Sequence, residues 1–173
     1  MDGTTRRARR MMSALLALAL LAATLGVAGC GGGDEEGTAT QGPARFGKTR
    51  IAVNLGLAAG ATKRYIVDPA QEGGFAKGAP KRKRTIAKAI VAGAFAAKQL
   101  NDAKKLAERD PDIQPLVANI TGLTGVLGGL TAALQGGNVD VTELVGAGSE
   151  VDQLLEAGKA LGLDVTERTP PGL

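Results

Sequence analysis

The stretch IQPLVANITGLTGVLGGLTAAL, residues 113–134, determines the fold class of this chain of 173 residues. Large aliphatic residues recur in it at alternating steps of four and three residues, and they form a leucine seam: Leu116, Ile120, Leu123, Leu127, Leu130 and Leu134. In an α-helix this spacing puts the six side chains on one side, as at the core positions of a helical bundle. The glycines of the stretch lie off the seam, and each costs a helix up to about 1 kcal/mol relative to alanine. We therefore expect this helix to depend on burial of the seam.

Two helices are expected before the seam. The first covers residues 51–67 and ends at Asp68, because the residue before a proline avoids the α conformation. It contains Gly56 and Gly60, a pair of small residues that allows another helix to approach closely. The second runs from about residue 80 or 85 to residue 109. Its expected apolar stripe is Ile86, Ile90, Gly93, Ala97, Leu100, Ala103 and Ala107.

One helix is expected after the seam. Asp140 and Glu143 resemble a capping box at its start, and Gly162 suits the position just after its end. Gly146, Gly148 and Ser149 are residues that can break it. Four amphipathic helices with short connections predict an all-α fold, a small antiparallel bundle of about four helices. The expected organisation is a signal peptide at 1–29, a lipidated cysteine and flexible tether at 30–50, a helical bundle at 51–163, and a loose tail at 164–173.

The N-terminal segment has the features of an export signal. Four arginines between residues 6 and 10 precede 18 residues without a charge, Met11 to Ala28. Small residues then lead to Cys30, the only cysteine of the chain. A basic start, an apolar run and small residues before a cleavage point are typical of a secretory signal peptide. The alternative is an uncleaved signal anchor that contains an ordinary cysteine.

The block Val27-Ala28-Gly29-Cys30 resembles the lipobox of bacterial lipoproteins. That resemblance implies a diacylglycerol thioether on Cys30, cleavage before it, and acylation of the new amino group. Two or more acyl chains anchor a protein stably. It therefore implies a protein of the cell membrane, lipid-anchored on its extracytoplasmic face.

A second resemblance lies within the first predicted helix. The segment NLGLAAG at residues 54–60, with Arg64-Tyr65-Ile66, is similar to stretches of uncharacterised exported helical proteins of actinobacteria. This resemblance implies no activity.

The composition excludes several classes of chemistry. The chain has no histidine, one cysteine and 2% aromatic residues. Triads that need histidine, zinc ribbons and disulfide frameworks are therefore impossible, and stacking platforms for nucleic-acid bases are not expected. Asp110 and Asp112 flank Pro111, where they could hold a cation, but acids at a helix start far more often cap the helix. We predict no catalytic residue, no metal site and no cofactor.

The charge is divided unevenly along the chain. Residues 45–109 hold 15 basic and 4 acidic residues, whereas residues 110–173 hold 2 basic and 9 acidic residues. The basic part peaks at Lys81-Arg82-Lys83-Arg84, where positive charges at a helix start oppose the helix dipole. Two explanations stay open. The two parts pair across the bundle as solvated ion pairs, or the run contacts anionic lipid headgroups or wall polymers. Nucleic acid is not an expected partner, because the run lacks interleaved aromatic residues.

These observations predict a lipoprotein of the cell envelope that acts as a non-enzymatic binding or structural module. Its expected partner is the membrane, through the lipid on Cys30, and the sequence identifies no protein partner. The alternative is a membrane-active protein whose helix 113–135 is inserted in the bilayer. The 27 residues from Ile113 to Val139 carry no charge, which is long enough to span about 30 Å of hydrocarbon.

Overall fold

The computed structural model describes residues 43–172. The predicted signal peptide at 1–29, the lipobox Val27-Ala28-Gly29, Cys30 and the tether up to residue 42 lie outside the described residues. The described part contains four long helices and no strand: α2 (Pro43–Thr62), α4 (Arg82–Ala107), α5 (Val117–Gln135) and α6 (Val141–Ala160). Three shorter elements complete it: a π-helix (Lys63–Val67), α3 (Asp68–Gln71) and a 3₁₀ helix (Gln114–Leu116). The prediction of an all-α bundle is confirmed.

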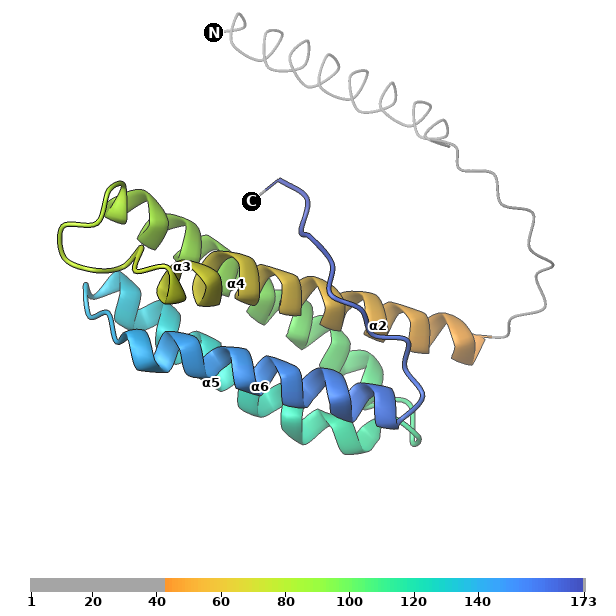
Figure 1. The fold of residues 1–173 in the computed structure, drawn as a ribbon. Helices are drawn as coiled ribbons and strands as arrows, with labels where there is room; N and C mark the ends of the chain where they lie inside the picture. The colour runs from red at the N-terminus through yellow and green to blue at the C-terminus, as the bar shows by residue number, and fades with distance from the viewer. Residues whose placement is uncertain (1–42, 173) are drawn as a thin grey trace, which may run out of the picture. The chain divides into compact units, whose positions relative to one another are not determined.

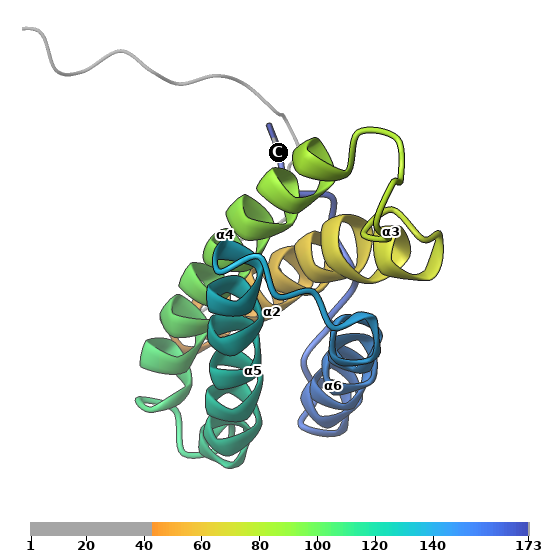
Figure 2. The ribbon, with the colours of Figure 1, turned by 90° about the vertical axis from the view of Figure 1, so that its left-hand side faces the viewer.

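The long helices run in alternating directions around one core (Figure 1). Seen from the end, they occupy four corners, with α4 beside α2 and α5 beside α6 (Figure 2). The contacts close the ring, because α4 also packs on α5 and α2 also packs on α6.

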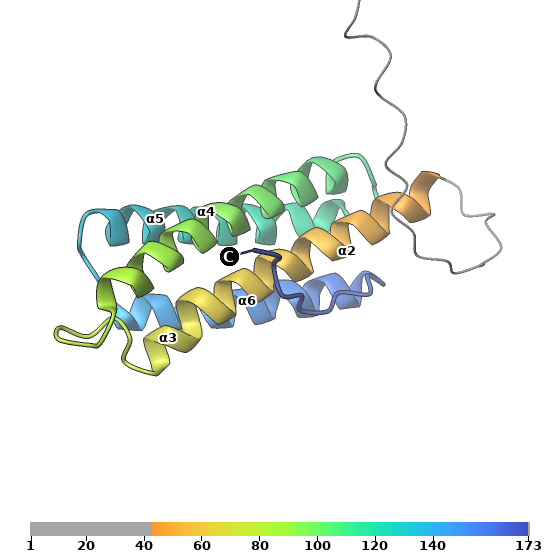
Figure 3. The same ribbon diagram turned by 90° about the horizontal axis from the view of Figure 1, so that it is seen from above.

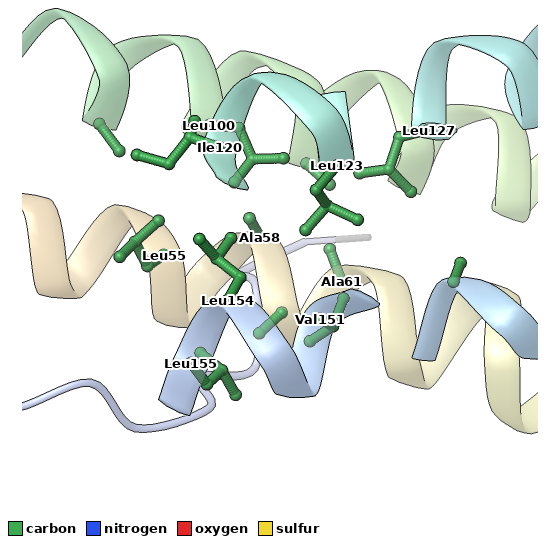
Figure 4. Packing of buried hydrophobic residues seen from close by; sticks show 14 of the residues in the cluster. Leu55, Ala58, Ala61, Leu100, Ile120, Leu123, Leu127, Val151, Leu154 and Leu155 are labelled. Carbon is green, nitrogen blue, oxygen red and sulfur yellow. The ribbon is translucent and has the colours of Figure 1, made fainter. Parts of the chain in front are cut away.

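The leucine seam of α5 forms the middle of the core (Figure 4). All six seam residues are buried, with at most 5% of each exposed. Three of them, Ile120, Leu123 and Leu127, face Leu55, Ala58 and Ala61 of α2 and Val151 and Leu154 of α6 (Figure 4). The helical spacing therefore identified the buried face of α5 correctly.

The buried face of α4 consists mostly of alanine, and it includes four of the seven residues of the predicted stripe: Gly93, Leu100, Ala103 and Ala107. Ile86, Ile90 and Ala97 are only half-buried. The fully covered positions are Ala89, Ala92, Gly93, Ala96, Leu100, Ala103 and Ala107. Short side chains let α4 approach its neighbours closely, and a Cβ at Gly93 would collide with the hydroxyl of Thr131 on α5.

The helical run that contains α2, the π-helix and α3 extends beyond the predicted helix at both ends. It begins at Pro43 rather than Ile51, so the predicted tether is shorter at its C-terminal end. Proline suits a first helical turn, and Lys48 is held by an ion pair to Asp112 at 3.0 Å. At the other end, the π-helix carries the chain past Asp68 into α3, where Pro69 occupies a first-turn position that needs no N–H.

The residues after α6 form a strap across α2 instead of the predicted loose tail (Figures 1 and 3). Val165 and Pro170 are buried, and the N–H of Arg168 donates to the carbonyl oxygen of Gly56 at 3.0 Å. The extended strap therefore packs against Gly56 and Gly60, at the place where the sequence predicted a second helix. A Cβ at either glycine would collide with a backbone carbonyl of the strap.

Helix α6 is continuous, because Gly146, Gly148 and Ser149 do not break it. Gly148 is buried and packs against Val67, where a close approach favours a small residue. The predicted cap is present, since Asp140 Oδ1 accepts from the N–H of Thr142 at 2.8 Å and of Glu143 at 3.4 Å.

We predict that Leu127→Asp unfolds the bundle, because it places an unpaired charge in the core at a cost of several kcal/mol. The matched control is Val126→Asp, since Val126 is the neighbouring residue and is 37% exposed. Helical circular dichroism of the chain from Gly31 onward should be lost in the first variant and retained in the second. A helical signal that survives Leu127→Asp would mean that the seam does not hold the bundle.

Substitution of glycine by alanine should have opposite effects at two helical positions. At Gly60 the added methyl meets the carbonyl of Arg168, so Gly60→Ala should lower stability by about 1–3 kcal/mol. At Gly122 on α5 no atom lies within 4 Å of the added methyl, so Gly122→Ala should raise stability by up to about 1 kcal/mol. Thermal unfolding checks both, and an equal upward shift would show that the strap is not seated on α2.

A candidate anion-binding site at the start of α4

The loop between α3 and α4 turns the chain back onto the bundle. Gly73 and Gly78 have φ angles of 74° and 89°, and Lys81 has a φ of 64°. Lys81 is the one non-glycine residue of the described chain in this left-handed region, which is unfavourable for a long side chain. Its carbonyl accepts from the N–H of Arg84 at 2.8 Å and of Thr85 at 3.0 Å. The turn thus leads directly into α4, and no side chain caps the helix.

The predicted contact run Lys81-Arg82-Lys83-Arg84 divides into residues with different surroundings. Arg82 is half-buried, and its Nε donates to the carbonyl oxygen of Phe75 at 2.7 Å. Phe75 is 2% exposed and fixes the loop to the core. Arg82 therefore holds the loop on α4, whereas Lys81, Lys83 and Arg84 are exposed.

Lys81 and Arg84 share an open pocket with Lys88, one turn further along α4. The pocket measures about 560 Å³. Thr85 of α4 also lines it, and the rest of the lining comes from the π-helix, α3 and the loop: Tyr65, Pro69, Glu72, Gly73, Gly74, Ala79 and Pro80. Lys83 is not among the lining residues.

The pocket has an excess of positive charge. In the described part of the chain, Lys81, Arg84 and Lys88 form no ion pair with a carboxylate. Glu72 is the one acidic residue in the lining. The Nζ of Lys88 lies 5.6 Å from the centre of the Tyr65 ring, a cation–π contact that holds the ammonium beside the pocket. The positive end of the α4 dipole adds to this field.

Other cations of the basic part are paired with acids. Lys48 meets Asp112 at 3.0 Å, and Lys63 bonds to both Asp152 at 2.6 Å and Glu167 of the strap. Burial of Lys63 disfavours its charged form, but these two hydrogen bonds outweigh it and raise the pKa of the ammonium. The two oppositely charged parts of the chain thus meet at these points. They do not meet at the start of α4.

A second basic pocket, of about 470 Å³, lies between α2 and the other end of α4. Arg50, Lys105 and Arg109 line it together with Asp102. A hydrogen bond from Lys98 at 2.8 Å, with the charges of Lys98 and Lys105, lowers the pKa of Asp102. Because Asp102 is then a carboxylate among these cations, this pocket carries a partly compensated charge.

The acidic candidates have structural partners. The N–H of Asp112 donates to Asp110 Oδ1 at 3.1 Å, which closes the turn after α4, and the Asp112 carboxylate pairs with Lys48. Within residues 43–172, no cluster of three or more acids, histidines or cysteines could hold a metal ion.

Sequence reasoning identified the basic run but missed its companions in the pocket. Lys88 lies four and seven residues after Arg84 and Lys81, a helical spacing that could have been noticed. No sequence signal placed Tyr65 or Glu72 there, because Tyr65 comes from the π-helix and Glu72 from the first residue after α3. Arg82 was included in the contact run, and only its hydrogen bond to Phe75 shows its different role.

One helix of the described chain, residues Gln114–Gln135, is long and apolar enough to cross a membrane by length and composition. This segment includes α5, and its leucine seam is buried in the bundle core. Its other side presents Gly122, Gly125 and Gly129 with no atom within 4 Å of an added Cβ.

In comparisons with protein-family models, curated proteins and solved structures, the chain matches none.

Proposed function

We propose that this protein is a lipoprotein of the cell envelope, anchored through Cys30 on the extracytoplasmic face of the membrane. It acts as a non-enzymatic binding module. Its helical bundle presents the cations at the start of α4 to anionic groups, such as lipid headgroups or wall polymers.

The main support is a group of cations that local stability does not explain. Lys81, Lys83 and Arg84 are exposed at the positive end of a 26-residue helix. Like charges there oppose the helix dipole and repel one another, and Lys81 also has an unfavourable backbone angle. In the described chain no carboxylate pairs with them. An external anion would relieve this repulsion.

The short chain between the anchor and the bundle keeps the domain near the membrane, although it joins α2 at the end of the bundle opposite the start of α4 (Figure 1). Twelve residues, 31–42, separate Cys30 from the start of α2 at Pro43. Even fully extended, such a segment reaches only about 40 Å. A domain on a tether of this length would stay close to the headgroups, where each cation gains roughly 1 kcal/mol from an anionic surface.

A membrane-active function, with α5 inserted in the bilayer, is favoured by one observation: the length and apolar composition of residues 114–135. Insertion would remove the leucine seam from the core, which would leave the facing positions of α2 and α6 uncovered. Protease digestion of sealed vesicles decides between the two, since an inserted α5 would leave a protected fragment around residues 113–135.

The anchor predicts a specific mass for the protein in membranes. The wild-type chain should lack residues 1–29 and carry acyl groups, while Cys30→Ala should carry none. Gly32→Ala, which leaves the lipobox intact, should be acylated like the wild type. Intact-mass spectrometry of the membrane fraction checks this, and an unmodified Cys30 in the wild type would overturn the lipoprotein proposal.

The basic run predicts binding to anionic surfaces that salt reverses. The chain from Gly31 onward should sediment with vesicles of anionic lipid and be released between 0.1 M and 1 M salt, as the Debye length falls from about 10 Å to about 3 Å. Replacing Lys81, Lys83 and Arg84 by glutamine should abolish most of this binding.

The matched control removes the same charge elsewhere, by replacing Lys98, Lys105 and Lys159 with glutamine. All three are exposed, and all three have acidic neighbours. This variant should bind nearly as well as the wild type. Equal loss in both variants, or equal binding to neutral vesicles, would show that the start of α4 is not the contact.

A further inference from the structure

We propose that the pocket formed by Tyr65, Lys81, Arg84 and Lys88 binds the phosphate group of a small organic phosphate. This deepens the function proposed above and rests on it, since the same end of α4 provides the cations. It goes further in assigning a defined site to a single ligand, in place of a diffuse contact between a surface and a charged run.

The charges in the pocket match a phosphate. Three cations and Glu72 leave an excess of two positive charges, equal to the charge of a phosphate dianion. Arg84 can donate two parallel hydrogen bonds to two oxygens of one phosphate, and the two lysines provide point charges that adapt in position. The Thr85 hydroxyl also lines the pocket, and its 3.5 Å contact with the carbonyl of Lys81 is long enough to be exchanged for a ligand.

The donors are side chains rather than the backbone of the helix start. The N–H groups of Arg82, Arg84 and Thr85 already donate to carbonyls of Ala79 and Lys81. A phosphate at this site therefore cannot be held as it is by a bare helix N-terminus. Because the phosphate would be bound by the side chains of Lys81, Arg84 and Lys88, each contribution to binding can be removed by a single substitution.

The size and walls of the pocket indicate that the ligand is larger than phosphate itself. About 560 Å³ falls in the range of small-molecule sites, roughly 300–1,000 Å³. The Tyr65 ring, Pro69 and Pro80 give the lining an apolar part beside the cations. The phosphate would lie on α4, and its organic substituent would contact this apolar part. Glycerol phosphate, either free or as the headgroup of an anionic lipid, has this chemistry.

Tyr65 makes the pocket directly observable. The chain has one tyrosine and no tryptophan, so all of its intrinsic fluorescence near 300 nm comes from this ring. A phosphate that draws Lys88 away from the ring would change that emission. The experiment uses the full chain in a neutral, non-absorbing detergent and titrates it with inorganic phosphate, glycerol phosphate and, at equal ionic strength, sodium chloride.

The expected result is a saturable change with both phosphates, tighter with glycerol phosphate, and no saturable change with chloride. Lys81→Gln, Arg84→Gln and Lys88→Gln should each weaken binding roughly fivefold, which corresponds to about 1 kcal/mol per cation. Lys83→Gln removes a cation of the same run outside the pocket and should leave the affinity unchanged. Glu72→Gln should strengthen binding, because it removes the one negative charge of the lining.

Calorimetry with glycerol phosphate provides a second measurement for Lys88→Gln, since that substitution itself alters the surroundings of Tyr65. Addition of vesicles with anionic headgroups distinguishes the two sources of the phosphate. If the pocket binds a lipid headgroup, the vesicles should change the Tyr65 emission as glycerol phosphate does. If it binds a soluble phosphate, the vesicles should leave the emission unchanged.

Two results would overturn the proposal that this pocket binds phosphate. One is a change in Tyr65 emission that is equal for phosphate and chloride. The other is a loss of affinity in Lys83→Gln as large as in Lys81→Gln. Such a result leaves vesicle binding by the chain from Gly31 onward untouched, because that binding needs only exposed cations. If vesicle binding is absent while Tyr65 reports saturable phosphate binding, the surface function fails and the pocket stands.

Discussion

Burial of the leucine seam of α5 is the interaction on which the rest of the structure depends. Helix α5 contains glycine at many of its other positions, and a Cβ added at Gly122, Gly125, Gly128 or Gly129 would meet no atom within 4 Å. Such a sequence has little tendency to form a helix alone, so its conformation follows from the contacts of the seam. The same six residues complete the cores of α2, α4 and α6. Bundle and helix therefore form together or not at all.

The seam supplies six of the large side chains in the core, and their size shapes the helices that face them. Helix α4 faces it almost entirely with alanine, so the two helices must approach closely, and Gly93 marks the point of closest contact with Thr131. The other glycines that matter, Gly56 and Gly60, serve the backbone of the strap in the same way. A core with few large residues holds together by bringing backbones near one another. That leaves little room for a polar group inside, and Thr62 is the one buried polar residue of the described chain.

The parts of this fold that the sequence predicted are those where large side chains carry the signal. The spacing of Leu123 and Leu127 identifies the buried face of α5 without ambiguity. Alanine gives no comparable signal, because it is tolerated both inside and outside, and the buried Ala89, Ala92 and Ala96 of α4 were missed for that reason. The strap could not be predicted, since residues 164–172 have no periodicity and its seat at Gly56 and Gly60 is indistinguishable in sequence from a helix-packing motif. In the candidate site, the charged run was visible, but the inward role of Arg82 depends on where the loop places the carbonyl of Phe75.

At the start of α4, the fold holds residues in conformations and charge arrangements that are locally unfavourable. At several other places local and tertiary preferences agree: Asp140 caps α6, Pro43 begins α2, and Lys48 and Lys63 have acidic partners. At α4 a lysine adopts a left-handed angle, cations crowd the positive end of a dipole, and a π-helix directs Tyr65 to the same place. A left-handed residue of this kind costs on the order of 1 kcal/mol, and a π-turn within a helix is rare outside functional sites. The seam, at the centre of the bundle, is what allows one end to hold these unfavourable features. Several departures from local rules gather at this one end of the bundle, and the fold does not require them, which is the physical reason for proposing a ligand there.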